Sequence, residues 1–316
     1  MIFSGRTDVG KKRLNNQDSF FAEKLCENAE LLVVCDGMGG ANGGNVASAL
    51  AAETFVNAVR ERIAPFIEKE SGELVFEGKL AAETVLTNAV EEANSAVFSR
   101  AGEDIELDGM GTTLVAALSV GSKVWVVNVG DSRLYLLSGG DCVQITHDHS
   151  FVQYLVDIGQ ITPGEAENHP NKNIITRAVG CAETVEADIS ELVLDSFPAY
   201  LLLCSDGLSN ELKPKEIVEI VFGKKKGRRS FRLERPEKSP AEGSVDGAAD
   251  VSAHGEKNGE SAENTGSDVE RSVAERSVAD QKELDKKADA LVSRANANGG
   301  RDNVTVVLAK YDGNVQ

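Results

Sequence analysis

Two apolar runs along the chain end in Asp-Gly. Residues 31–37 read Leu-Leu-Val-Val-Cys-Asp-Gly, and residues 200–207 read Tyr-Leu-Leu-Leu-Cys-Ser-Asp-Gly. Short apolar runs rich in Val and Leu predict buried strands, and a glycine after them lets the backbone turn tightly. One Asp-Gly after a strand is an ordinary turn. Two copies indicate that two strands carry carboxylates, Asp36 and Asp206, to the same place.

Helical spacing of apolar residues marks the segments around these strands. Apolar side chains recur every three or four positions over residues 46–66 and 80–97, which predicts two amphipathic helices packed on a sheet. Two short helices are expected at 151–158 and after the capping box at 162–165, where they form a surface flap. Another short helix is expected at 214–221.

The middle of the chain changes from helical to strand-like spacing. Three β-rich runs, at 114–120, 123–129 and 133–137, are separated by Gly-Ser or Gly-Asp turns. This spacing predicts an antiparallel meander, because alternating βαβ units would need longer connections. The turn before the third run contains Asp131, another carboxylate at a strand end.

One long segment lacks the apolar residues that a core needs. Residues 224–238 carry a net charge of +6 and residues 239–280 one of −7, and no Leu, Ile, Met, Phe, Tyr, Trp or Cys occurs from 236 to 280. Such a segment cannot bury enough apolar surface to offset its ordering entropy, so we expect disorder. Its basic part can dock an acidic partner and its serines can accept phosphate, but a tolerated insertion explains it equally well.

Regular patterns return after this segment. Apolar residues recur at helical spacing over 284–295, and an alternating strand follows at 304–308. The segment of unusual composition therefore interrupts one domain. We expect a single domain made of residues 1–223 and 283–316, with a disordered, charge-segregated insert at 224–282.

The overall charge limits the classes of partner. The 316 residues include 33 Lys and Arg against 51 Asp and Glu, a net charge of −18, which argues against binding nucleic acid or an anionic membrane through the general surface. No apolar run is long enough to span a bilayer and the first residues lack a secretory signal, so we expect a cytoplasmic protein. The five cysteines lack C-x-x-C spacing and are expected to be free, buried thiols.

Acidic residues at strand ends indicate a metal site. Asp36, Asp131, Asp206 and Asp302 each stand beside a glycine or a turn at the end of an apolar strand. If these ends converge, repulsion between the carboxylates is tolerable only with cations between them. Oxygen ligands favour Mg²⁺ or Mn²⁺, while the four histidines are too few and too poorly spaced for a histidine-rich zinc site.

A polar stretch near the N-terminus adds a cation. Residues 13–19 read Arg-Leu-Asn-Asn-Gln-Asp-Ser, in which Arg13 can hold a phosphate by forked hydrogen bonds and Asp18 can lie in the outer shell of a metal. A solvated turn before a strand explains the same stretch. Two ions about 3.5–4 Å apart, together with such an arginine, predict hydrolysis of a phosphoester. Glycoside hydrolysis by two carboxylates stays open, but it does not explain Asp-Gly pairs after strands.

Seven short motifs follow one another along the chain. They are Asn15-Asn16-Gln17-Asp18, Asp36-Gly37-Met38-Gly39-Gly40, Gly111-Thr112-Thr113, Gly130-Asp131-Ser132-Arg133, Thr146-His147-Asp148-His149-Ser150, Ser205-Asp206-Gly207 and Gly300-Arg301-Asp302-Asn303. In this order and spacing the chain resembles the metal-dependent protein phosphatases of type 2C, most of all the bacterial members, outside residues 224–282. The resemblance implies an α+β fold: a four-layer αββα sandwich of two antiparallel β-sheets flanked by helical pairs, with a dinuclear metal site at one end.

The same resemblance implies a role for each candidate residue. The ligands of two Mn²⁺ or Mg²⁺ ions, and of a weaker third ion, would be Asp36, Gly37 through its carbonyl, Asp206, Asp302, Asp131 and, through a water, Asp18. Arg13 and Asn303 would bind the phosphate, and the expected catalytic residues are Asp36, Arg13 and Asp206.

The implied activity is hydrolysis of phosphoserine and phosphothreonine in proteins by a metal-activated water, without a covalent intermediate. The substrates would be proteins phosphorylated by an opposing Ser/Thr kinase, the flap at 147–180 would meet them, and the protein would act as a monomer. The alternative is a non-catalytic module of the same fold that binds a phosphoprotein or a signal ligand. Retention of the site aspartates favours the enzyme, because a pure binder has no need for a dense carboxylate cluster.

One position departs from the pattern of many relatives. They carry a histidine in or just after the glycine cluster, proposed as the general acid, whereas Met38 and Ala41 stand here. Loss of a general acid costs about 10²–10⁴-fold in rate if nothing replaces it. We therefore expect a slower or differently pH-dependent enzyme. Separately, we expect His147 and His149 to be hydrogen-bonded structural residues.

Overall fold

A computed structural model of the chain describes residues 1–223 and 266–313. Residues 224–265 and 314–316 lie outside the described residues, and most of the expected insert falls there. Within the described ranges, no helix is both long enough and apolar enough to cross a bilayer.

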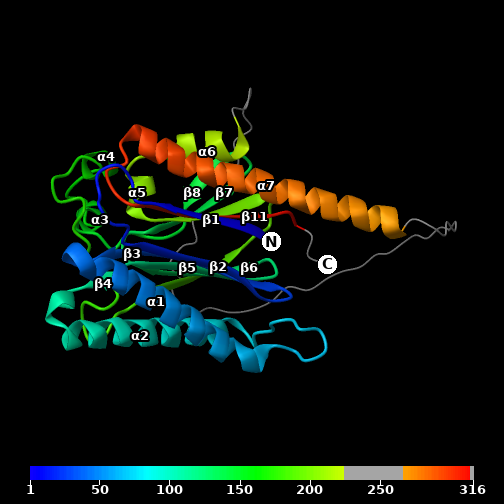
Figure 1. Ribbon diagram of the computed structural model, residues 1–316, viewed down its shortest axis with the longest axis horizontal. Helices are drawn as coiled ribbons and strands as arrows, with labels where there is room; N and C mark the ends of the chain where they lie inside the picture. The colour runs from blue at the N-terminus through cyan, green and yellow to red at the C-terminus, as the bar shows by residue number, and fades with distance from the viewer. Residues whose placement is uncertain (224–265, 314–316) are drawn as a thin grey trace, which may run out of the picture.

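Two antiparallel sheets lie face to face (Figure 1). The strand order of the first sheet is β1 (Ile2–Asp8), β11 (Val304–Tyr311), β10 (Ala199–Cys204), β7 (Arg133–Ser138) and β8 (Asp141–Gln144). The order of the second is β2 (Asp18–Cys26), β3 (Ala29–Met38), β5 (Leu114–Val120), β6 (Lys123–Val129) and β9 (Asp188–Val193), with β4 (Gly111–Thr112) paired to β3. The two predicted Asp-Gly strands are β3 and β10, one in each sheet.

Helices cover the outer face of each sheet. The pair α1 (Gly40–Ile63) and α2 (Lys79–Glu103) packs on the second sheet, and α6 (Pro214–Phe222) and α7 (Gly266–Asn298) pack on the first (Figure 1). The flap contains α3 (Phe151–Asp157) and α4 (Pro163–Ala166), and α5 (Asp206–Ser209) follows β10. The short 3₁₀ turns η1 (Ala64–Phe66) and η2 (Ile105–Leu107) follow α1 and α2. The predicted four-layer αββα sandwich is confirmed.

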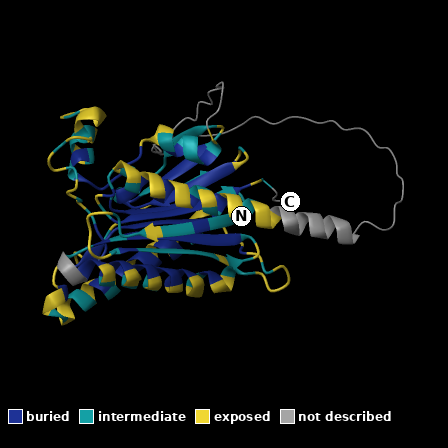
Figure 2. Cartoon of the chain, turned by 45° about the horizontal axis from the view of Figure 1, so that its top comes forward, coloured by how far each residue is buried: buried dark blue, intermediate teal, exposed yellow. Residues whose placement is uncertain are grey.

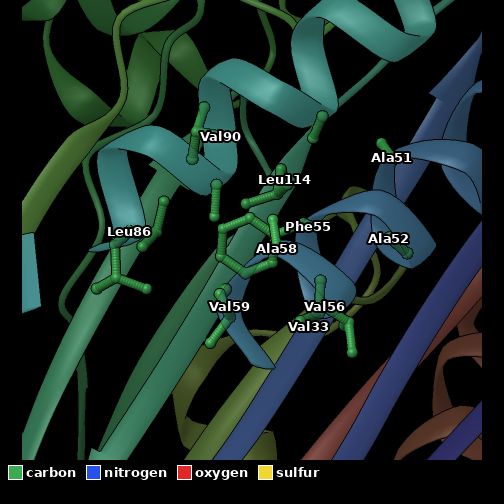
Figure 3. Packing of buried hydrophobic residues seen from close by; sticks show 14 of the residues in the cluster. Val33, Ala51, Ala52, Phe55, Val56, Ala58, Val59, Leu86, Val90 and Leu114 are labelled. Atoms are coloured by element: carbon green, nitrogen blue, oxygen red, sulfur yellow. The ribbon is translucent and has the colours of Figure 1, made fainter. Parts of the chain in front are cut away.

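The layers enclose three bodies of apolar side chains. One lies between the sheets, and one lies between each sheet and its helices. Burial follows this layering, since the central strands are dark in Figure 2 while the edge strands and the outer faces of α1 and α2 are partly exposed. Between α1 and α2, the fully buried Phe55 lies among Val59, Val90 and Leu114 (Figure 3). These packed layers hold the strand ends in fixed positions.

The predicted meander is wrong in its third strand. Strand β5 pairs with β6 as expected, but β7 pairs with β10 and β8 in the other sheet. A turn with Gly130 at φ 106° therefore connects the two sheets instead of closing a hairpin. Local spacing does not distinguish a hairpin within one sheet from a crossing between two sheets, because both sides of each strand are buried. The crossing leaves Asp131 at the end of the sandwich.

The last helix begins earlier than its apolar pattern predicts. Helix α7 starts at Gly266, so residues 266–282 are helical where we expected disorder. Two of these residues contact the first sheet. Asp280 forms an ion pair with Lys310 at 3.3 Å, and Gln281 donates a hydrogen bond to the Phe3 carbonyl at 3.0 Å. Once its packed part is formed, a helix can extend by one hydrogen bond per added residue without a new nucleation step.

Candidate metal centre

Strands from both sheets bring five aspartates to one end of the sandwich. Asp18 begins β2 directly opposite Asp36 near the end of β3. Asp131 lies in the turn from β6 to β7, Asp206 begins α5 after β10, and Asp302 precedes β11. Asp36 experiences the charge of all four others. The structure therefore brings together the carboxylates that the sequence pattern singled out.

Burial and mutual repulsion perturb these carboxyl groups strongly. Burial raises the pKa of Asp36 well above its usual range, and the charges of the neighbouring aspartates add to this. Burial raises the pKa of Asp206 and of Asp18 to about 6, and that of Asp131 to about 8. In each case nearby carboxylates act in the same direction. Such a cluster is unfavourable by itself and becomes favourable when cations neutralise it.

The donors at this site fit a hard divalent cation. All five side chains offer oxygen, and Asp18 keeps one buried oxygen, Oδ1, without a hydrogen-bond partner while its Oδ2 accepts from Ser205 Oγ at 2.8 Å. Apart from Asp18, these side chains keep partial solvent exposure. Among the described residues, however, no three groups converge tightly enough to enclose an ion. Their roles as ligands therefore stay a prediction.

Glycine is required next to Asp36 for steric reasons. A Cβ on Gly37 would lie 1.9 Å from the Gly44 carbonyl oxygen and 2.6 Å from that of Gln17. The Gly37 amide donates to the same Gln17 carbonyl at 3.0 Å. The end of β3 therefore packs directly against the backbone that leads into Asp18.

Arg13 lies at the edge of the carboxylate cluster. Its Nη2 donates to Asp302 Oδ2 at 2.7 Å, and about half of its side chain is exposed. This hydrogen bond, assisted by the charges of Asp302, Asp36 and Asp206, raises the pKa of Arg13. A guanidinium has five donors, so others stay available for an incoming anion.

Comparisons with known proteins agree with this architecture. A sequence model of the family described as protein phosphatase 2C matches residues 8–242. The chain belongs to this family. Serine/threonine phosphatase stp of Listeria monocytogenes is 32% identical over 307 residues, which cover 97% of this chain and 94% of that relative.

Solved structures extend the likeness to the protein phosphatase 2C fold. The serine/threonine phosphatase Stp1 from Staphylococcus aureus has a TM-score of 0.69 at 32% identity, covering 98% of this chain and 95% of that one. The catalytic domain of serine/threonine protein phosphatase PstP, solved with two manganese ions, has a TM-score of 0.64 at 30% identity, covering 98% and 97%.

In this member of the protein phosphatase 2C family, the Asn303 side chain is hydrogen-bonded to backbone groups. Its Nδ2 donates to the carbonyls of Val9 at 2.9 Å and Asn15 at 3.0 Å, and its Oδ1 accepts from the Gln17 amide at 2.8 Å. Both amide protons are therefore used by backbone. These contacts brace the loop that carries Arg13, and the phosphate-binding role of Asn303 stays a prediction.

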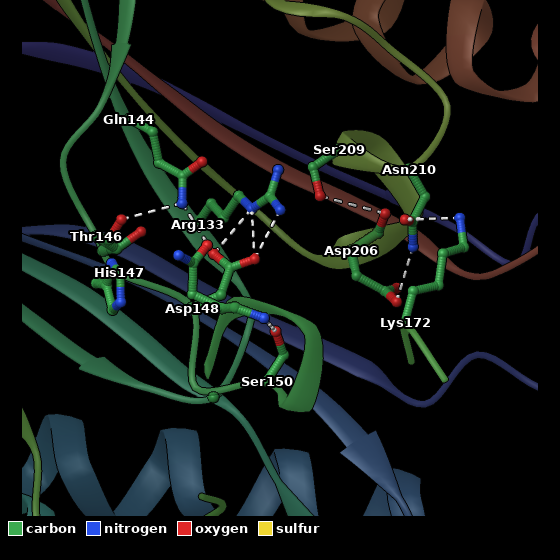
Figure 4. A network of polar contacts seen from close by, with 12 residues as sticks. Arg133, Gln144, Thr146, His147, Asp148, Ser150, Lys172, Asp206, Ser209 and Asn210 are labelled. Atoms are coloured by element: carbon green, nitrogen blue, oxygen red, sulfur yellow. Dashed lines mark hydrogen bonds and ion pairs between the residues drawn. The ribbon is translucent and has the colours of Figure 1, made fainter. Parts of the chain in front are cut away.

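Sequence reasoning also missed a cation beneath the site. Arg133 forms a forked ion pair with Asp148, with Nε–Oδ1 at 2.9 Å and Nη2–Oδ2 at 2.6 Å, and Gln144 donates to Asp148 at 2.8 Å (Figure 4). The charge of Arg133 lowers the pKa of Asp131 and of Asp206, against their burial. An arginine beginning an otherwise apolar strand was the available signal.

The segment 146–150 holds the Asp131 turn from its other side. His149 Nδ1 accepts from the Gly130 amide at 3.1 Å, and the His149 amide donates to the Gly130 carbonyl at 2.9 Å. His147 Nε2 pairs with Asp157 at 2.8 Å. Both histidines are hydrogen-bonded structural residues, as predicted.

Replacing Asp148 should destabilise the protein measurably. We expect Asp148→Asn to lower the free energy of unfolding by about 1–3 kcal/mol, because it leaves the largely buried Arg133 without its counter-charge. Urea denaturation in EDTA measures this. Asp157→Asn is the matched control, since its pair with His147 is exposed and should contribute less than about 1 kcal/mol. Equal losses in the two variants would contradict the role of Asp148.

Proposed function

We propose that this chain is a Mn²⁺- or Mg²⁺-dependent protein serine/threonine phosphatase that hydrolyses phosphoserine and phosphothreonine without a covalent intermediate. The observation that carries the proposal is the convergence of five strand-end aspartates beside Arg13 in a phosphatase 2C fold. The names of the relatives, which include a phosphatase solved with two manganese ions, support the same reaction.

The carboxylates would hold the ions. We propose that Asp36, the Gly37 carbonyl, Asp206 and Asp302 would hold two ions, and that Asp131 would join Asp206 at a weaker third ion. When bound, such ions lower the pKa of water and neutralise charge on a phosphoryl group.

Other side chains would position water and substrate. The unpartnered Asp18 Oδ1 can accept a hydrogen bond from a water in the site and so orient that water. Arg13 would bind the phosphate through donors that Asp302 leaves free. Asp36, Arg13 and Asp206 are therefore the proposed catalytic residues.

The cellular setting follows from the chemistry. Phosphoserine and phosphothreonine proteins must be supplied by an opposing Ser/Thr kinase, and all five cysteines are free, which fits the reducing cytoplasm. We infer a monomer with one catalytic domain made of residues 1–223 and 283–316. The place of β11 between β1 and β10 supports that domain, because the C-terminal segment completes the first sheet.

Metal removal and restoration test the function. We expect phosphate release from a phosphothreonine peptide to vanish in EDTA and to return with Mn²⁺ or Mg²⁺, because the carboxylates repel one another and the phosphate until cations neutralise them. The measurement is colorimetric phosphate release. No turnover at any concentration of either metal would refute the enzymatic function and leave the non-catalytic binding module as the alternative.

A further inference from the structure

The loop beside Arg13 presents an unusual surface to solvent. Residues 11–15 read Lys-Lys-Arg-Leu-Asn, and all five are exposed. Leu14 is 96% exposed, the largest exposed fraction among the exposed large apolar side chains of the described residues. Lys11, Lys12 and Arg13 form a run of three cations in a chain whose net charge is −18. Apolar surface and positive charge thus meet next to the proposed phosphate-binding arginine.

Hydrogen bonds fix this loop at both ends. The Lys11 amide donates to the Gly300 carbonyl at 2.7 Å, and Asn303 donates to the carbonyls of Val9 and Asn15. The exposed Leu14 is therefore held on a braced backbone and is not the end of a loose loop. A rigid apolar contact loses little entropy when a partner covers it.

Exposed apolar groups and a cation also occur on the flap. Tyr154 and Ile174 are 55% and 50% exposed. Lys172 donates to Asn210 Oδ1 at 3.4 Å, and Asn210 Nδ2 donates to Asp206 Oδ2 at 3.0 Å (Figure 4). The loop of residues 9–17 and the flap helices lie at the same end of the sandwich in Figure 1.

Charge makes the loop selective. A phosphorylated substrate is anionic, and the body of this chain would repel it. Within about 8–10 Å, however, local cations outweigh distant charges because salt screens the rest. Lys11 and Lys12 would attract acidic side chains near the phosphate, while Leu14 would accept an apolar one.

We propose that Lys11, Lys12 and Leu14 form a substrate-docking surface that selects phosphorylated segments with an acidic and an apolar residue close to the phosphoresidue. The inference rests on the phosphatase activity proposed above. Lys12 and Leu14 flank Arg13 directly, so the residues they contact lie within about three positions of the phosphoresidue in an extended chain of about 3.3–3.6 Å per residue.

Two substitutions at exposed positions test the surface. The probes are phosphothreonine peptides that differ only in flanking residues: Glu against Lys for charge, and Leu against Ser for the apolar contact. We expect Lys12→Glu to reduce the preference for Glu-flanked over Lys-flanked peptide about fivefold or more, mainly through KM. Leu14→Ser should reduce the preference for Leu over Ser about threefold. The charge effect should shrink in high salt.

Lys69→Glu is the matched control for charge. Lys69 is exposed in the loop after η1, at the other end of the sandwich (Figure 1), and should leave both preferences unchanged. Unchanged preferences in Lys12→Glu and Leu14→Ser, with peptide hydrolysis intact, would overturn the docking surface and leave the phosphatase standing. A wild-type protein that shows no preference among the four peptides would overturn it as well. If no peptide is hydrolysed with metal present, the proposed phosphatase activity itself would be refuted.

Discussion

Asp36→Asn should lower kcat/KM about 10³-fold and at the same time make the metal-free protein more stable. One of the proposed metal ligands would be lost, and bound ions contribute several kcal/mol to such reactions. A loss of about 4 kcal/mol corresponds to about 10³-fold in kcat/KM. Stability should change in the opposite direction, because burial and four neighbouring aspartates disfavour the ionised form of Asp36.

Thermal unfolding with and without Mn²⁺ checks both parts of this prediction. In EDTA we expect the Tm of Asp36→Asn to exceed that of the wild type by about 3 °C or more. Saturating Mn²⁺ should raise the Tm of the wild type and have little effect on the variant, since ligands stabilise only the state that binds them. Asp195→Asn, at an exposed position, is the control and should match the wild type throughout. A variant that is less stable in EDTA would contradict the repulsion between the carboxylates.

The metal-free protein should lose stability as pH rises from about 5 to 8. Asp18 and Asp206 have pKa values raised to about 6, and Asp131 to about 8, while an aspartate of the unfolded chain titrates near 4. In this window the folded protein binds protons that the unfolded chain does not, so raising the pH favours unfolding. His149 opposes this trend, because burial lowers its pKa.

Differential scanning calorimetry in EDTA measures the pH effect. We expect Tm to fall by about 5 °C or more between pH 5 and pH 8. Asp131→Asn should flatten the curve between pH 6 and 8, because it removes the group that titrates highest among these values. Mn²⁺ should reverse the trend, since deprotonated carboxylates bind the ion better. A Tm that rises with pH in EDTA would refute the prediction.

The strand-end carboxylates could be predicted because their signal is local. An apolar run followed by Asp-Gly specifies a strand, its end and a carboxylate in a few adjacent residues, as at Asp36 and Asp206. The family resemblance then supplied the order of the layers. Arg13 was predicted for the same reason, because it belongs to a short polar motif before a strand.

Contacts between distant segments could not be read in this way. The turn at Gly130 looks like a hairpin, and only the stacking of two sheets makes it a crossing. Asn303 braces a loop nearly 300 residues away in sequence, and Asp148, which follows β8, pairs with Arg133 at the start of β7. The early start of α7 depends on Asp280 and Gln281 touching strands β11 and β1. Each depends on tertiary neighbours, which a single sequence pattern does not contain.

The central place of β11 has a consequence for biosynthesis. This strand lies between β1 and β10, and Asp302 immediately precedes it. A nascent chain that ends before residue 302 lacks one proposed ligand and the strand that joins β1 to its sheet. The second sheet, α1 and α2 are complete by residue 193 and can pack while the ribosome is still translating. Dephosphorylation would therefore begin only after the ribosome has added β11.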